Sequence, residues 1–104
     1  MSKEQSSDVV IIGAGVIGCS IAYHLRKAGV EVLVIEREEV AAEASSAAAG
    51  LLSPLGALAS PGPFTDLVLA SWSLAPALMA ALEEESGIQV EYRQIGSLHV
   101  ASET

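Results

Sequence analysis

The feature that most constrains the fold is an apolar run followed by three closely spaced glycines, in the stretch DVVIIGAGVIGCSIAYHL. Residues Asp8–Ile12 are β-branched and almost continuously apolar, which is typical of a buried strand in a parallel sheet. Glycines interrupt this run, and from Val16 onward apolar residues recur with the period of a helix, which Gly29 ends. The stretch therefore predicts a strand, a tight turn and a helix in direct succession.

A second apolar run, EVLVI, occupies residues 31–35 and ends at Glu36. Strand, helix and strand within about thirty residues form a βαβ unit, whose strands are parallel. Hydrophobic residues make up 51% of the 104-residue chain and aromatic residues 4%, a mixture that suits helices packed on a sheet better than a β-sandwich. The expected fold class is α/β, with a Rossmann-like βαβ unit at the N-terminus.

The three glycines have the spacing G-x-G-x-x-G, at positions 13, 15 and 18. In a nucleotide-binding unit Gly13 allows the sharp turn, Gly15 lets a pyrophosphate approach the backbone, and Gly18 lets the helix pack closely against the strand. The N-terminus of the helix offers unpaired N–H groups and partial positive charge to phosphates. The competing interpretation is a tight turn that binds no nucleotide.

The acidic residue that such a unit requires is also present. Glu36 stands 21 residues after Gly15, close to the spacing of about 20 that places a carboxylate on the ribose. We expect it to accept hydrogen bonds from both ribose hydroxyls and to repel a 2′-phosphate. Strand, helix, spacing and acid together favour dinucleotide binding, although the motif alone does not separate NAD from FAD.

The segment ASSAAAGLLSP, Ala44–Pro54, favours FAD. A pure NAD domain would have a second βα unit here, whereas these small residues allow the backbone to approach a flat, bulky group. A short helix from about Ser46, with Ser45 as its cap, would add N–H groups for a phosphate. Without a ligand, the same segment is simply an alanine-rich cap of a core helix.

The remainder of the chain predicts a second region. A Pro/Gly-rich connection over residues 53–63 precedes one long helix over Phe64–Ser86, with Pro76 inside it as a kink or a break into two helices. Trp72 is expected to lie in the core. Two short strands are expected over Ile88–Arg93 and Gly96–Ala101. The resulting domains are 1–53, part of a nucleotide-binding domain, and 54–104, the start of a second domain with a mixed sheet.

Composition excludes several partners and sites. The formal net charge of −8 disfavours nucleic acid and anionic membrane surfaces. Cys19 is the single cysteine, expected to be a small buried hydrophobe in a reducing, cytoplasmic compartment. No signal peptide and no metal-ligand spacing is recognisable. No catalytic role is assigned to His24, His99, Tyr92 or Arg93.

These motifs carry a resemblance to a known family. DVVIIGAGVIGCSIAYHLRKAGVEVLVIER followed by ASSAAAGLLSP resembles the N-terminus of the FAD-dependent D-amino-acid oxidase superfamily. SAAAGLL, PGPFTDLVLASWSLAPALMAALEEESGI and EYRQIGSLHVA are most similar to the glycine oxidases of thiazole (thiamine) biosynthesis. The glycine motif is general to the superfamily, and the later segments are more specific.

The resemblance implies an FAD site and the residues that form it. Glu36 would bind the adenosine ribose, with Arg37 near the adenine. The pyrophosphate would lie on the glycine turn, formed by Gly13, Gly15, Val16, Ile17 and Gly18. Phosphate and ribityl groups would contact Ala44, Ser45 and Ser46, and the flavin ring would lie against Ala49, Gly50 and Leu51. The implied reaction oxidises an amine next to a carboxylate and reduces O₂ to H₂O₂.

Family members are much longer, and their substrate-carboxylate arginine comes from later sequence. We therefore expect these residues to be the N-terminal part of an oxidase of glycine or another small amino acid, inactive alone. The remainder would follow in the same chain or come from a separate one, and the complete enzyme is expected to be a homo-oligomer. Two alternatives stay open, a non-catalytic nucleotide-binding subunit and a piece of an NAD-dependent dehydrogenase.

Overall fold

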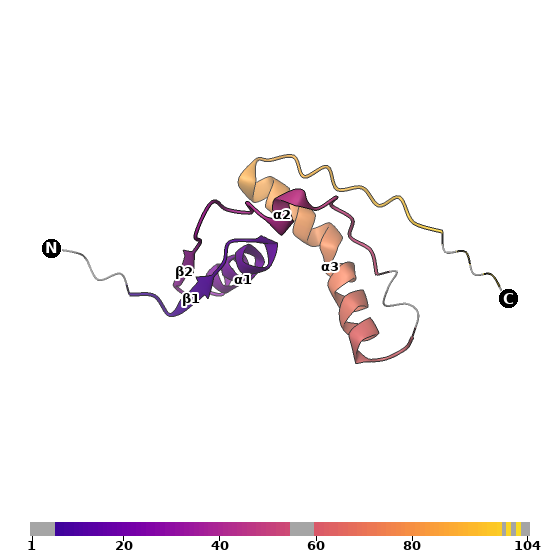
Figure 1. Ribbon diagram of the computed structural model, residues 1–104, viewed down its shortest axis with the longest axis horizontal. Coiled ribbons are helices and arrows are strands. Elements are labelled where there is room, and N and C mark those ends of the chain that lie inside the picture. Colours follow the sequence, from indigo (N-terminus) through magenta and orange to yellow (C-terminus); the bar gives the residue numbers. More distant parts are fainter. Residues whose placement is uncertain (1–5, 55–59, 99, 101, 103–104) are drawn as a thin grey trace. The chain divides into compact units, whose positions relative to one another are not determined.

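The computed structural model describes residues 6–54, 60–98, 100 and 102. The chain divides into two compact units, residues 1–51 and 52–104, and each is described here by itself. Five elements follow one another along the described residues, and Figure 1 labels them in order. They are β1 (Val9–Ile12), α1 (Val16–Lys27), β2 (Val32–Ile35), α2 (Ala44–Ala47) and α3 (Pro63–Ser86).

The first unit contains the predicted βαβ arrangement. β1 and β2 pair in parallel, with Val9 opposite Val32 and Ile12 opposite Ile35. The pairing continues beyond the strands, because the N–H of Gly13 donates to the carbonyl of Ile35 at 2.7 Å. The N-terminus of α1 therefore begins directly beyond the carboxyl end of β1, where α/β folds bind their ligands.

The helix α1 ends where its sequence predicts. Arg26 and Lys27 occupy its last turn, where the negative end of the helix dipole favours basic side chains. Gly29 has a φ of 84°, a left-handed conformation that ends many helices, and its N–H donates to the carbonyl of Arg26 at 3.0 Å. The turn leads straight into β2, which keeps the connection short.

Burial in the two strands differs from the expectation. Residues on one face of the sheet, including Ile11, are half-buried next to α1, whereas the other face is exposed and consists of Val10, Ile12, Leu33 and Ile35. The expectation of strands buried on both faces is therefore wrong for the described part of the chain, because α1 covers one face only. Cys19 is likewise half-buried rather than buried, with its Sγ 3.5 Å from the carbonyl of Ala14.

The helix α2 is short, as expected, but it begins earlier than expected. It spans four residues, Ala44–Ala47, so Ser45 lies within it and Glu43 occupies the N-cap position. The prediction of Ser45 as the cap of this helix is therefore wrong. Its hydroxyl is used elsewhere, as described below for the glycine turn, and so short a helix adds little dipole of its own.

The helix α3 is the main element of the second unit. It runs for 24 residues through Pro76 without a break, so the alternative of two shorter helices is wrong. It begins after Gly62 with Pro63 in its first turn, and it ends at Gly87, whose φ is 69°. Trp72 is 38% exposed, so its predicted place in a core is also wrong, while Ala75 on the same helix is buried.

By length and composition alone, α3 is long and apolar enough to cross a membrane. A core helix of a soluble protein passes the same test. Along α3 the exposed apolar side chains include Phe64, Leu67 and Leu74.

The two short strands expected after α3 are not found among the described residues 88–98, 100 and 102. Glu91 and Gly96 have φ values of 54° and 72°, which interrupt an extended backbone. An isolated pair of strands is marginal in water, so these segments need further sheet partners to pair. His99 and Ala101 lie outside the described residues.

Candidate nucleotide-binding site

In the turn between β1 and α1, each of the three glycines is required for a different physical reason. Gly13 has a φ of 102°, a conformation that side chains rarely adopt. At Gly18 the reason is space, because a Cβ there would lie 2.0 Å from the carbonyl oxygen of Gly13 and 3.3 Å from Cγ2 of Ile11. The expectation that Gly18 permits close packing of helix on strand is thus confirmed.

Gly15 is the N-cap of α1 and differs from the other two glycines. Its φ of −76° and ψ of −177° are extended backbone that any residue adopts. A Cβ at this position would meet Ser45 Oγ at 3.2 Å and no other described atom within 4 Å. Ser45 reaches this point because its hydroxyl accepts the N–H of Val16, the first residue of α1, at 2.8 Å.

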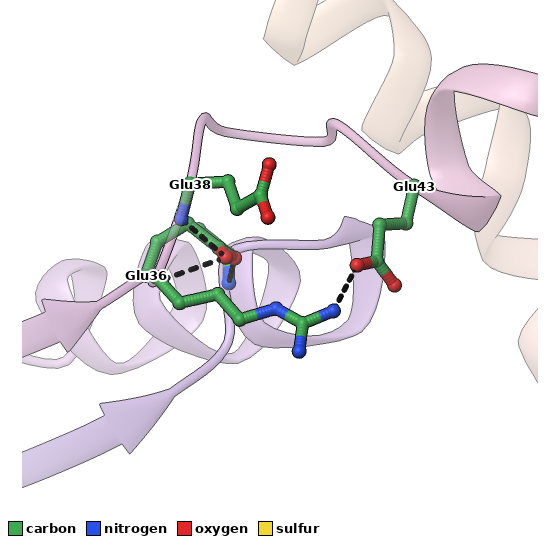
Figure 2. A network of polar contacts seen from close by, with 5 residues as sticks. Glu36, Glu38 and Glu43 are labelled. Carbon is green, nitrogen blue, oxygen red and sulfur yellow. Dashed lines mark hydrogen bonds and ion pairs between the residues drawn. The ribbon is translucent and has the colours of Figure 1, made fainter.

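Glu36, at the carboxyl end of β2, is tied to the same turn. Its Oε2 accepts the N–H of the buried residue Ala14 at 2.8 Å, and its Oε1 accepts the N–H groups of Arg37 at 2.8 Å and Glu38 at 3.2 Å. Figure 2 shows these bonds converging on one carboxylate. The bond from Ala14 is the main cause of a pKa of Glu36 below its ordinary value, and the bond from Glu38 and the nearby Arg37 charge add to it.

The loop between Glu36 and α2 closes over this turn. The Arg37 guanidinium forms an ion pair with the Glu43 carboxylate, which Figure 2 shows across the loop. The N–H of Ala41 donates to the carbonyl of Ala14 at 2.9 Å. Ala41 has a φ of 60°, a conformation that is uncommon for alanine. The ion pair connects the two ends of the loop, and the hydrogen bond from Ala41 holds the loop next to the glycine turn.

Together these segments enclose a cleft of about 460 Å³ within the first unit. It brings together six of the predicted site residues: Gly13, Gly15, Glu36, Arg37, Ala44 and Ser45. Val16 contacts Ser45 at its rim through its amide. The other predicted residues do not line the cleft; they are Ile17, Gly18, Ser46, Ala49, Gly50 and Leu51.

Six further residues line the cleft that sequence reasoning did not select: Ile12, Ile35, Glu39, Ala41, Ala42 and Glu43. Ile12 and Ile35 are strand ends, which a rule that ligands bind at the carboxyl ends of parallel strands would have identified. No sequence motif marks the four loop residues, and the hydrogen bond from Ala41 to the carbonyl of Ala14 places their loop beside the cleft.

Other chemistry-bearing residues lie away from this cleft. Among the described residues no group of three His, Cys, Asp or Glu side chains is placed to hold a metal ion. The His24 ring packs edge-on against Tyr23, with 5.1 Å between the ring centroids. In the second unit Tyr92 is half-buried and Arg93 is exposed.

Comparison with known proteins places this geometry in a family. Residues 8–104 match the family described as "DAO: FAD dependent oxidoreductase". The chain belongs to this family. It is 42% identical over 94 residues to glycine oxidase of Bacillus licheniformis, and 39% identical over 97 residues to the bifunctional protein ThiO/ThiG of a Synechocystis strain. The match covers 90% and 91% of this chain, respectively.

Solved structures of this family agree with the fold. Glycine oxidase from Bacillus cereus superposes with a TM-score of 0.75 at 40% identity over 85% of this chain, and the enzyme from Geobacillus kaustophilus with 0.74 at 40% over 80%. The α/β, Rossmann-like fold of an FAD-binding domain is thus confirmed. The matches cover 26% and 15% of the two curated relatives and 23% and 22% of the two solved chains, so this chain spans about a quarter or less of their length.

The family is FAD-dependent, and the residues of the first unit fit that nucleotide. The glycine turn gives a ligand access to main-chain N–H groups, with a single serine hydroxyl at the place a Cβ on Gly15 would approach. Glu36 lines the same cleft, and its carboxylate accepts the N–H of Ala14 in the glycine turn. The cleft volume of about 460 Å³ suits part of a dinucleotide and not all of it.

Proposed function

We propose that this chain is the FAD-binding N-terminal part of an amino-acid oxidase of the glycine oxidase type. One observation supports this most strongly: Glu36 and the glycine turn, including Gly15 at the N-cap of α1, line one cleft, and the Ala14 hydrogen bond of 2.8 Å joins them. This arrangement provides a hydrogen-bond acceptor for a ribose next to a binding site for a diphosphate.

In this proposal the N–H of Ile17 binds the diphosphate of FAD directly. Val16 contributes through Ser45, whose hydroxyl accepts the Val16 N–H at 2.8 Å and keeps its own proton for a phosphate oxygen. Glu36 accepts a hydrogen bond from the adenosine ribose. Three backbone N–H groups already use its oxygens, and a carboxylate has about four acceptor positions. One position is therefore left, on Oε2, so we propose one ribose hydroxyl on Glu36 rather than the two expected from sequence.

The remaining predicted contacts complete the proposal. Arg37 lies beside the adenine, and the small residues from Ala44 to Ser46 approach the phosphate and ribityl groups. The exposed segment at Ala49, Gly50 and Leu51 is available to the flavin ring. No residue of this chain is assigned a catalytic role, and its part in the reaction is to bind and orient the cofactor.

FAD, when bound, supplies the two-electron oxidation of an amine next to a carboxylate, and its reoxidation by O₂ gives H₂O₂. We propose glycine or another small amino acid as the substrate, since three of the four relatives named above are glycine oxidases. We further propose a cytoplasmic enzyme, homo-oligomeric when complete, in which additional sequence from the same or a separate chain forms the substrate site.

The test is to purify the complete protein and record its visible spectrum, then measure H₂O₂ release with glycine, sarcosine and small D-amino acids. Flavin absorption with peroxide release supports the proposal. Flavin absorption without release from any of these amines would leave a non-catalytic flavin-binding subunit. Protein that takes up no FAD would contradict the proposal altogether.

A further inference from the structure

We infer that Ser45 is a positioning residue that holds the N-terminus of α1 in place for the diphosphate. Its hydroxyl lies on the first turn of α1 and accepts the N–H of Val16 at 2.8 Å. The bond joins two segments that are 29 residues apart in sequence. This inference rests on the proposed function for the identity of the ligand, but not for the contact itself.

The chemistry of a hydroxyl suits it to this task. Ser45 Oγ acts as acceptor toward Val16 and therefore keeps its own proton for donation to another acceptor. A phosphate oxygen near the N-terminus of α1 is such an acceptor. The bond to Val16 and a bond to phosphate are thus compatible, and hydrogen bonds in a chain of this kind strengthen one another.

The same contact gives Gly15 a reason that differs from ligand access alone. Its backbone conformation is open to any residue, so backbone strain does not require glycine here. A Cβ would approach Ser45 Oγ at 3.2 Å, a distance at which the hydroxyl must move by a few tenths of an ångström. Glycine at position 15 therefore leaves room for the Ser45 hydroxyl as well as for the diphosphate. An alanine there would displace this hydroxyl from the N–H of Val16.

Capping by Ser45 also explains why this serine does not cap its own helix. In α2 the N-cap position belongs to Glu43, which makes no side-chain cap hydrogen bond. The hydroxyl instead caps α1, which has 12 residues and the stronger dipole of the two helices. The short helix α2 thus supplies, through Ser45, the hydroxyl that caps the longer helix α1.

The first experiment measures hydrogen exchange in the FAD-free complete protein, on a peptide that contains Val16. Ser45→Ala should speed exchange of this amide about fivefold, the effect expected for loss of a helix N-cap. Ser45→Thr, which keeps the hydroxyl, should restore slow exchange. Ser73→Ala, which removes an exposed hydroxyl from α3, serves as the control and should leave the peptide unchanged.

The second experiment is a double-mutant cycle on FAD affinity with Gly15→Ala and Ser45→Ala. We expect Gly15→Ala to raise the Kd for FAD about tenfold when Ser45 is present, and about twofold when residue 45 is alanine. If a Cβ at position 15 interfered with the diphosphate alone, its effect would be the same in both backgrounds.

Together, the hydrogen-exchange and FAD-affinity experiments distinguish a failure of this inference from a failure of the proposed function. Protein that never binds FAD would contradict the proposed function, while exchange at Val16 would still decide whether Ser45 caps α1. If FAD binds, but exchange is unaffected by Ser45→Ala and the two substitutions act independently on the Kd, then Ser45 is not a positioning residue.

Discussion

The carboxylate of Glu36 accepts the main-chain N–H of Ala14 at 2.8 Å, so the end of β2 is bonded directly to the glycine turn. Ala14 is buried, with 2% of its surface exposed, and its amide has a charged acceptor in place of water. An acidic residue selected from sequence for binding a sugar therefore also has a structural role within the chain itself.

Glu36→Gln should weaken this bond selectively. An amide has one oxygen where the carboxylate has two, so it cannot accept from Ala14 and from the Arg37 and Glu38 amides in the same arrangement. We expect the Kd for FAD to rise about tenfold, the scale of one hydrogen bond to a charged group. Fluorescence titration of the complete apoprotein measures it. Glu84→Gln on α3 removes the same charge elsewhere, and an equal loss in that variant would contradict the prediction.

The same bond predicts a dependence of stability on pH. The pKa of Glu36 is lower in the folded protein than its ordinary value of 4.5, chiefly because of the Ala14 N–H, so its ionised form favours folding. This contribution is complete above pH 4.5 and is lost as the pH falls below 4.5 through the lowered pKa. Thermal unfolding between pH 3 and 7 should therefore show a smaller acid loss for Glu36→Gln than for the wild type. Parallel curves would contradict this.

Gly18→Ala should destabilise the protein, although the same change in a helix interior ordinarily stabilises by about 0.5–1 kcal/mol. The added Cβ would lie 2.0 Å from the Gly13 carbonyl oxygen, so α1 must move away from β1. We expect a loss of about 2 kcal/mol or more in the free energy of unfolding, as for overpacked cores. Denaturant titration measures it, and the exposed Ser20→Ala in the same helix is the control. A stabilised Gly18→Ala protein would show that α1 does not pack on β1 in this way.

The ion pair between Arg37 and Glu43 should contribute little to stability. Their side chains are 74% and 67% exposed, and pairs of this kind contribute about 0.2–1 kcal/mol. A double-mutant cycle with Arg37→Gln and Glu43→Gln should give a coupling in this range at low salt and almost none at 1 M salt, because salt screens exposed charges. A coupling that persists at high salt would mean that the pair is shielded from solvent.

The part of the fold predictable from sequence is the part set by local chemistry. The glycine turn, the ends of α1 and the long helix α3 follow from backbone conformation, capping and periodicity, which neighbouring residues determine. The place of Ser45 could not be predicted, because a serine before small residues is equally suited to cap its own helix. Only the three-dimensional structure shows that the Ser45 hydroxyl contacts the N-terminus of α1 instead of that of its own helix, α2.

Predictions that depend on partners were the ones that failed. The apolar runs of β1 and β2 indicate strands covered on both sides, but one helix covers one side. The strands expected over residues 88–101 fail among the described residues for a related reason, since a strand forms where another edge accepts its N–H groups. Four residues of the loop after Arg37 were missed, because no motif marks them and a long-range hydrogen bond from Ala41 places the loop; they are Glu39, Ala41, Ala42 and Glu43.

The uncovered face of the two-stranded sheet has a practical consequence. Val10, Ile12, Leu33 and Ile35 form an exposed apolar surface, and within the described part of the chain each strand has one edge that pairs with no other strand. Such surfaces attract one another between molecules. The 104 residues produced on their own should therefore accumulate as insoluble aggregates in an expression host, and solubility should return when the sequence is produced together with whatever shields that face.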